Sequence, residues 1–145
     1  MSDTWKKLIE ELSKLQHDFI EVAQQIEIPG RNRPGVCGSW SPKEVVAHIS
    51  GWNKEVIRQF SLFRDGLEQA IEDDMDEFNK KSVQERQHLS WEETINELKH
   101  THKQFYHRAR SISSQELSGN KEYKAWVEVQ IEHYKHHIKQ LKKWL

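Results

Sequence analysis

The sequence contains very little cysteine, proline or glycine. Its 145 residues include one cysteine, three prolines and six glycines. A single cysteine, Cys37, excludes a disulfide within the chain and fits a reducing compartment. Most prolines and glycines gather at Pro29, Gly30, Pro34, Gly35 and Gly38, where they interrupt helical periodicity for about a dozen residues and predict a long crossover loop.

A long apolar run and a dominant charge are also absent. No stretch approaches the roughly eighteen apolar residues of a membrane span, and the first thirty residues lack the apolar core of a signal peptide. Lysine and arginine number 22 against 23 acidic residues, so no net field attracts nucleic acid or an anionic membrane. We therefore expect a cytoplasmic, soluble protein with neither nucleic acid nor membrane as a partner.

The composition and the apolar spacing favour amphipathic helices. Apolar residues make up 35% of the chain and charged residues 31%, and the length suits one domain spanning residues 1–145. Apolar residues at alternating spacings of three and four predict helices over residues 4–27, 42–65, 91–112 and 122–144. On the last helix the predicted inward face carries Trp126, Gln130, His133, His137, Leu141 and Trp144.

Local start signals fix two of these helices. Ser41, Pro42 and Glu44 form a capping box with proline at the first helical position, and Ser90 with Glu93 forms a second box. The acidic, weakly patterned segment 67–89 predicts one or two short helices along the outside or one end. The fold class is therefore all-α, a four-helix bundle with a long first crossover and short extra helices between its second and third long helices.

Three histidines occupy or flank apolar seams of the predicted helices. His133 and His137 are one turn apart, so their side chains leave the same helix face. His48 lies about as far from the start of its helix as His137 lies from the end of the last helix, which puts them at one level if the two helices are antiparallel neighbours. A buried, unpartnered imidazole is costly, and a shared metal ion would supply a partner to all three.

Three neutral imidazoles suit a divalent metal ion such as Zn²⁺, Ni²⁺, Fe²⁺ or Mn²⁺ and leave coordination positions open. An open site is typical of catalysis on a small-molecule substrate, with a metal-held water as the reacting group. The alternative is a structural set of histidines without metal.

Three further residues are candidates for the wall of this pocket. Trp52 lies one turn beyond His48, and its simplest role is core packing. His102 sits in the seam of the third long helix, where a core histidine bonded to a carbonyl is the favoured alternative. Asp76, in the acidic segment, could hang over the pocket as a proton-transfer group, although such a run is more often a solvated face.

Three stretches of the chain resemble a known family. "GSWSPKE" at 38–44, followed by Ala47, His48, Ile49 and Trp52, resembles the second-helix signature of the DinB-like four-helix-bundle proteins. The stretches "DEFNKKSVQERQHLSWEETINELKHTHKQF" at 76–105 and "HYKHHIKQLKKW" at 133–144 resemble the ClbS/DfsB-type subgroup.

The resemblance implies an up-down-down-up bundle, frequently a homodimer, with a metal held by His48, His133 and His137. It implies a metal-dependent hydrolase or thiol transferase acting on a small molecule. The alternative is a non-catalytic or metal-independent protein of the ClbS/DfsB type, which binds or disarms a reactive metabolite.

Overall fold

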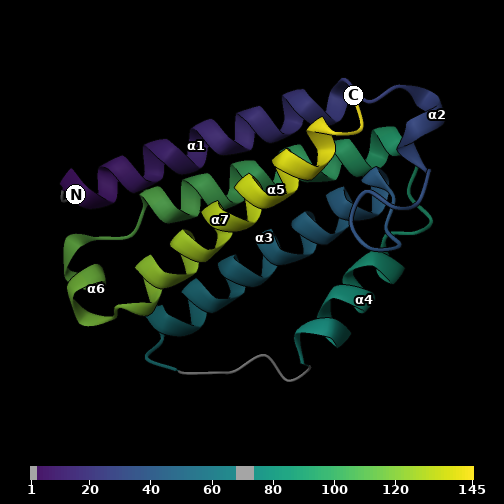
Figure 1. Ribbon diagram of the computed structural model, residues 1–145. Helices are drawn as coiled ribbons and strands as arrows, with labels where there is room; N and C mark the ends of the chain where they lie inside the picture. Colours follow the sequence, from purple (N-terminus) through teal and green to yellow (C-terminus); the bar gives the residue numbers. More distant parts are fainter. Residues whose placement is uncertain (1–2, 68–73) are drawn as a thin grey trace.

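The computed structural model describes residues 3–67 and 74–145, and this part of the chain is all-helical (Figure 1). The long helices are α1 (Asp3–Gln24), α3 (Pro42–Arg64), α5 (Trp91–Arg110) and α7 (Glu122–Lys142). The short helices are α2 (Ile28–Arg31), α4 (Met75–Glu85) and α6 (Ser114–Gly119). The predicted all-α bundle is confirmed.

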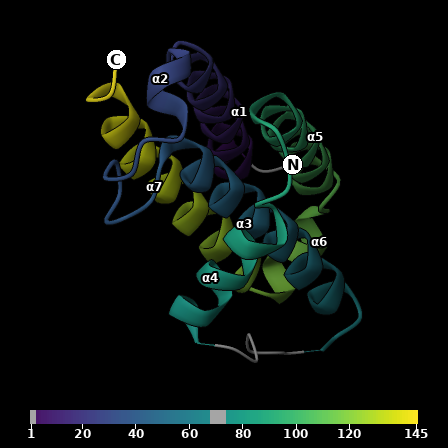
Figure 2. The same cartoon turned by 90° about the vertical axis from the view of Figure 1, so that its right-hand side faces the viewer.

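The long helices are arranged as a square seen in cross-section. α1 and α7 run one way and α3 and α5 the other, which is the up-down-down-up order (Figure 1). α1 packs against α5 and α7, and α3 packs against the same two helices, so α1 and α3 lie on opposite corners (Figure 2). The connection over residues 25–41 must therefore cross one end of the bundle, as the loop length predicted.

The predicted start signals operate as expected. The Ser41 hydroxyl accepts a hydrogen bond from the Glu44 backbone N–H (3.3 Å), and the Glu44 carboxylate accepts one from the Ser41 N–H (3.1 Å). Pro42 lies in the first turn of α3, where a missing N–H costs nothing. Ser90 and Glu93 make the same reciprocal pair at the start of α5 (3.0 and 2.9 Å).

Two short helices occupy segments that the sequence predicted as loop or turn. Pro29 lies in the first turn of α2, and Ser113 and Glu116 form a third capping box at α6. Both helices have fewer than two full turns and bury no residue. Neither therefore has an apolar stripe from which the sequence could predict it.

The buried face of α7 differs from the predicted one. Trp126, His133 and Trp144 are only half-buried, whereas Tyr123 and Tyr134 are 1% and 0% exposed. The buried residues of α7 are Tyr123, Val127, Gln130, Ile131, Tyr134, His137, Ile138 and Leu141. The two large tyrosine rings fill the core, and this rotates the histidine-bearing side toward the edge of the α3–α7 interface.

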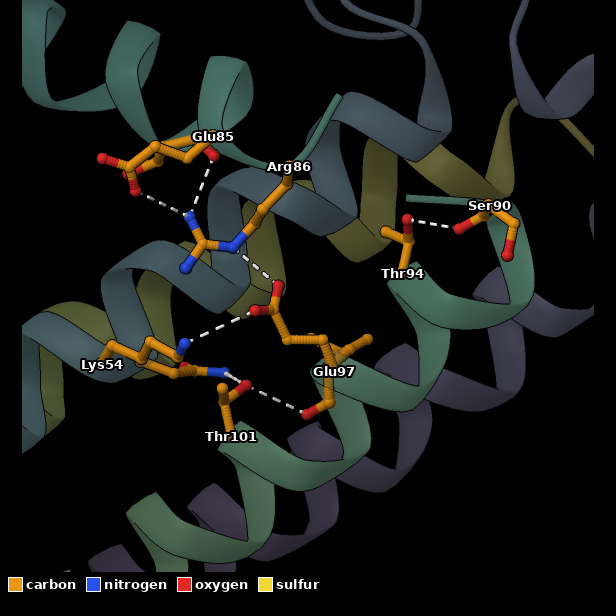
Figure 3. Close-up of polar contacts among 10 residues, drawn as sticks. Lys54, Glu85, Arg86, Ser90, Thr94, Glu97 and Thr101 are labelled. Atoms are coloured by element: carbon orange, nitrogen blue, oxygen red, sulfur yellow. Dashed lines mark hydrogen bonds and ion pairs between the residues drawn. The ribbon is translucent and has the colours of Figure 1, made fainter. Parts of the chain in front are cut away.

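One helix between the second and third long helices is described, and it docks along the outside of α3. Gly51 permits the close approach, since a Cβ there would lie 2.7 Å from the Cβ of Ser82. Just beyond the end of α4, Arg86 donates a hydrogen bond to Glu97 of α5 (2.6 Å), and Lys54 of α3 lies 3.5 Å from the same carboxylate (Figure 3). Residues 68–73 of the predicted segment 67–89 lie outside the described residues.

Gly51→Ala is expected to destabilise the protein by about 1–2 kcal/mol. Alanine normally stabilises a helix relative to glycine by about 1 kcal/mol, but here the added methyl meets Ser82 and overpacks the contact between α3 and α4. Urea unfolding measures the change. Gly119→Ala is the matched control, because a Cβ at Gly119 meets no atom within 4 Å. An equal effect of the two substitutions would contradict the docking argument.

Among the described residues, no helix has both the length and the apolar character that a membrane span requires.

Candidate metal centre

Three imidazoles meet at the interface of α3 and α7. His48 comes from the second turn of α3, while His133 and His137 come from successive turns of α7. The ring nitrogens that each offers lie within 4.8 Å of one another, and Nε2 of His48 is 2.7 Å from Nε2 of His133. Because α3 and α7 run antiparallel, the three imidazole rings lie at the same height along the bundle axis, as the sequence spacing predicted.

All three rings are held neutral. Burial, followed by the nearby His133 and His137, lowers the pKa of His48 to about 2, although the adjacent Asn79 amide acts in the opposite direction. Burial is also the main cause of the lowered pKa of His133, about 3, and of His137, about 4. A neutral imidazole keeps a lone pair on one ring nitrogen, and this is the form that binds metal.

Two glutamines orient the α7 histidines. Nδ1 of His133 lies 3.2 Å from the Gln130 Oε1, and Nδ1 of His137 lies 2.7 Å from the Gln140 Oε1. An amide oxygen only accepts, so both Nδ1 atoms carry hydrogen and both Nε2 atoms present a lone pair. Fixing a ligand histidine through its second nitrogen is the usual arrangement in metal sites.

His48 has an unsatisfied nitrogen. The side chain is 3% exposed, and its Nδ1 has no hydrogen-bond partner. Because His133 presents a lone pair at Nε2, His48 must supply the hydrogen of the 2.7 Å contact, which leaves its own Nδ1 as a buried acceptor.

This donor set fits a divalent ion. Ligand atoms around one zinc ion are about 3–3.5 Å apart, because each Zn–N bond measures about 2.0–2.1 Å. The spacings among the three histidines, from 2.7 Å to within 4.8 Å, bracket that value. A bound ion would also replace the hydrogen bond between His48 and His133. That bond occupies the Nε2 atoms of both rings, and each ring would need its Nε2 lone pair to bind the ion.

The histidines form the floor of a cavity of about 470 Å³. Three tryptophans line it: Trp40 from the loop before α3, Trp52 from α3 and Trp126 from α7. The Trp40 ring lies 4.8 Å from the His48 ring, centroid to centroid. A groove of about 510 Å³ between α1 and α7 contains none of the three histidines and is lined by lysines and carboxylates. The cavity above the histidines therefore joins apolar walls to a cluster of imidazole nitrogens.

The helix α4 completes one wall of this cavity. Met75 and Asn79 both line it. The Trp52 indole N–H donates a hydrogen bond to the Asn79 side-chain oxygen (2.7 Å), and the Phe78 ring packs 4.5 Å from the Trp52 ring. The docking of α4 on α3 thus determines the shape of the cavity.

The pocket candidates from the sequence are placed differently from one another. Trp52 lines the cavity, whereas His102 and Asp76 do not. Asp76 is exposed in the first turn of α4, and His102 is buried in the core between Phe19 and Tyr134. His102 also lacks the expected carbonyl partner, since neither of its ring nitrogens has a hydrogen bond.

A buried polar chain that the sequence patterns did not predict lies behind His133. The Gln130 side-chain N–H donates to the Asn53 Oδ1 (2.9 Å), which also accepts from the Tyr134 hydroxyl. The Asn53 side-chain N–H donates to the Thr101 hydroxyl (3.1 Å). The available signal was Gln130 on the predicted inward face of the last helix, because a buried amide requires partners.

The family model of the DinB superfamily matches residues 2–141. No curated protein and no solved structure matches the chain. The match covers nearly all of the described helices and includes all three histidines, so this chain belongs to the DinB superfamily.

Proposed function

We propose that the chain binds one divalent metal ion through His48, His133 and His137 and acts on a small molecule as a metal-dependent hydrolase or thiol transferase. The observation that carries the proposal is the convergence of three neutral imidazoles on the floor of a 470 Å³ cavity. A divalent cation supplies Lewis acidity toward a carbonyl oxygen and lowers the pKa of a coordinated water toward neutrality.

The residues of the chain support this activity in separate ways. Gln130 and Gln140 orient two of the histidines and keep the hydrogen on Nδ1, so that each Nε2 carries a lone pair. Three protein ligands leave room for a substrate atom. Trp40, Trp52 and Trp126 line the cavity and offer flat apolar surfaces to a substrate.

Metal analysis of untagged protein tests the proposal. After dialysis against Zn²⁺ or Ni²⁺ and removal of free ion, we expect about one equivalent in the wild-type protein and less than about a tenth in His48→Ala. His136→Ala is the matched control, because His136 lines the exposed rim of the cavity and does not belong to the cluster. Wild-type occupancy below about a tenth of an equivalent would overturn the proposal.

Turnover requires a second assay. Metal-loaded protein is tested for hydrolysis of 4-nitrophenyl esters and for thiol displacement of chloride from 1-chloro-2,4-dinitrobenzene. Activity that a chelator abolishes and that His133→Ala loses supports the enzyme. Activity that survives both changes contradicts it.

A second function is favoured by the same tryptophan walls. The cavity could bind a reactive apolar metabolite without metal, as in the ClbS/DfsB-type alternative. A neutral aromatic probe, N-phenyl-1-naphthylamine, distinguishes the two functions. Equal binding by metal-loaded, chelated and His48→Ala protein, together with no metal-dependent turnover, favours sequestration.

A further inference from the structure

We infer that Thr101, Asn53 and Gln130 form a relay of positioning residues that fixes the tautomer of His133. The relay begins on α5, crosses α3 and ends on α7, and its role in metal binding rests on the proposed function. Each step is a hydrogen bond whose direction the preceding step determines.

The first step is at Thr101, which is fully buried in α5 (Figure 3). Its Oγ1 lies 3.1 Å from the Leu98 carbonyl oxygen, which can only accept, so the hydroxyl hydrogen points there. The hydroxyl oxygen can then receive but not donate a second hydrogen bond. Thr101 therefore accepts from its neighbour on α3.

The second step is at Asn53, which is also fully buried. Because Thr101 accepts, the Asn53 amide nitrogen faces Thr101 (3.1 Å), and its oxygen must face the other way. That oxygen receives the Gln130 N–H (2.9 Å) and the Tyr134 hydroxyl. An amide oxygen has two lone pairs, so it can accept both hydrogens.

The third step is at Gln130, which is 2% exposed. Its nitrogen faces Asn53, so its oxygen faces Nδ1 of His133 at 3.2 Å. His133 must carry its hydrogen on Nδ1, and the lone pair on Nε2 then points at the cluster. The orientations of two hydroxyls, Thr101 on α5 and Tyr134 on α7, thus decide which nitrogen of His133 can bind metal.

The reversed chain is blocked at two places. If every amide flipped, Gln130 would donate to Nδ1 of His133, and Nε2 would carry hydrogen and could not bind an ion. The flipped Asn53 would present its oxygen to Thr101, whose hydroxyl would have to leave the Leu98 carbonyl. Its nitrogen would face the Tyr134 hydroxyl, which would lose the oxygen that now accepts its hydrogen. Removing both hydroxyls removes this asymmetry between the two directions.

Nitrogen-15 NMR of the histidine rings in chelator-treated protein tests the relay without metal. In the wild type, His133 is expected as the Nδ1–H tautomer and His48 as the Nε2–H tautomer. In Thr101→Val/Tyr134→Phe, which keeps the shape of both side chains, a substantial fraction of His133 is expected as Nε2–H. Zinc affinity is expected to fall about tenfold, within the usual range for residues that hold a ligand.

Thr94→Val is the matched control. Thr94 is fully buried on the same helix, and its hydroxyl donates to the Ser90 carbonyl oxygen (2.7 Å) (Figure 3). It is not part of the relay, so its loss should leave both the His133 tautomer and zinc affinity unchanged.

The triple variant Thr101→Val/Tyr134→Phe/Gln130→Glu tests the direction. A carboxylate at position 130 can only accept, and Asn53 is free to flip and donate to it once positions 101 and 134 have lost their hydroxyls. The Nδ1–H tautomer and zinc affinity should both return.

Each outcome is decisive. A wild-type His133 with its hydrogen on Nε2 overturns the relay even if Thr101→Val/Tyr134→Phe fails to fold. An unchanged tautomer in the folded double variant overturns it as well. A wild-type protein that binds no zinc but shows the expected tautomers overturns the proposed function and leaves the relay intact.

Discussion

The metal-free protein is expected to unfold as the pH falls from 7 toward 5. His48, His102, His133 and His137 are held neutral in the fold, with pKa values of about 2, 3, 3 and 4 against an ordinary value of 6.5. Burial is the largest cause in each case. The unfolded chain can take up protons at these positions at a pH where the folded chain cannot.

The direction of the effect follows from these lowered pKa values. Above about pH 6.5 neither state binds the extra protons, and the full stability is present. Below it, the unfolded state gains protons first, and stability is lost until the folded pKa values are reached. At pH 5 each histidine costs about 2 kcal/mol, or roughly 8 kcal/mol for four, which is comparable to the whole stability of a typical domain.

Urea midpoints of chelator-treated protein at pH 7, 6 and 5 measure this loss. Protonation of Glu93 and Glu116 does not interfere, because their pKa values are lowered from 4.5 by bonds to Ser90 and Ser113. Stability that stays constant from pH 7 to pH 5 would contradict the buried, neutral state of the histidines.

His102→Leu separates one histidine from the metal cluster. His102 packs against the rings of Phe19 and Tyr134, and neither of its ring nitrogens has a hydrogen-bond partner. An apolar side chain of similar volume should therefore stabilise the fold by about 1–3 kcal/mol at pH 7. The gain should grow by about 2 kcal/mol at pH 5, since one proton fewer is taken up on unfolding. A gain that does not change with pH would assign the effect to packing alone.

Saturating Zn²⁺ is expected to raise the Tm of the wild-type protein by roughly 10 °C. An ion at a thousand times its Kd stabilises the folded state by about 4 kcal/mol, and each kcal/mol shifts the Tm of a domain near this size by about 2–4 °C. His133→Ala, which leaves two ligands, should lose most of this shift. Thermal unfolding followed by circular dichroism, with and without chelator, measures it.

His136→Ala again provides the control. It removes an exposed imidazole next to His137 but leaves the three clustered rings in place. The zinc shift should match that of the wild type. Equal shifts in His133→Ala and the wild type would assign the stabilisation to ions bound elsewhere on the chain.

The histidine cluster could be predicted because it depends on few unknowns. The capping box at Ser41 and Glu44 fixed the depth of His48, and the i, i+4 spacing fixed His133 beside His137. The one assumption was that α3 and α7 are antiparallel neighbours, and the structure shows that they are. The up-down-down-up order came from the family resemblance, because periodicity alone does not order helices in space.

Other parts of the site could not be predicted, because they depend on contacts between distant segments. Helical periodicity marked His102 as inward-facing but could not tell the core from the cavity. The docking of α4 depends on one glycine, Gly51, meeting Ser82, and that pairing has no local signature. Asn79, rather than Asp76, lines the cavity because of this docking.

The sequence by itself determined the helix spans, two of the capped helix starts and the histidine trio, since caps and apolar stripes act between residues at most a few turns apart. Only the tertiary structure decided the rotation of α7, the tryptophan-lined cavity and the relay from Thr101 to His133. Those features depend on which side chains of separate helices fill the same space, and packing and hydrogen-bond satisfaction across the whole core decide that together.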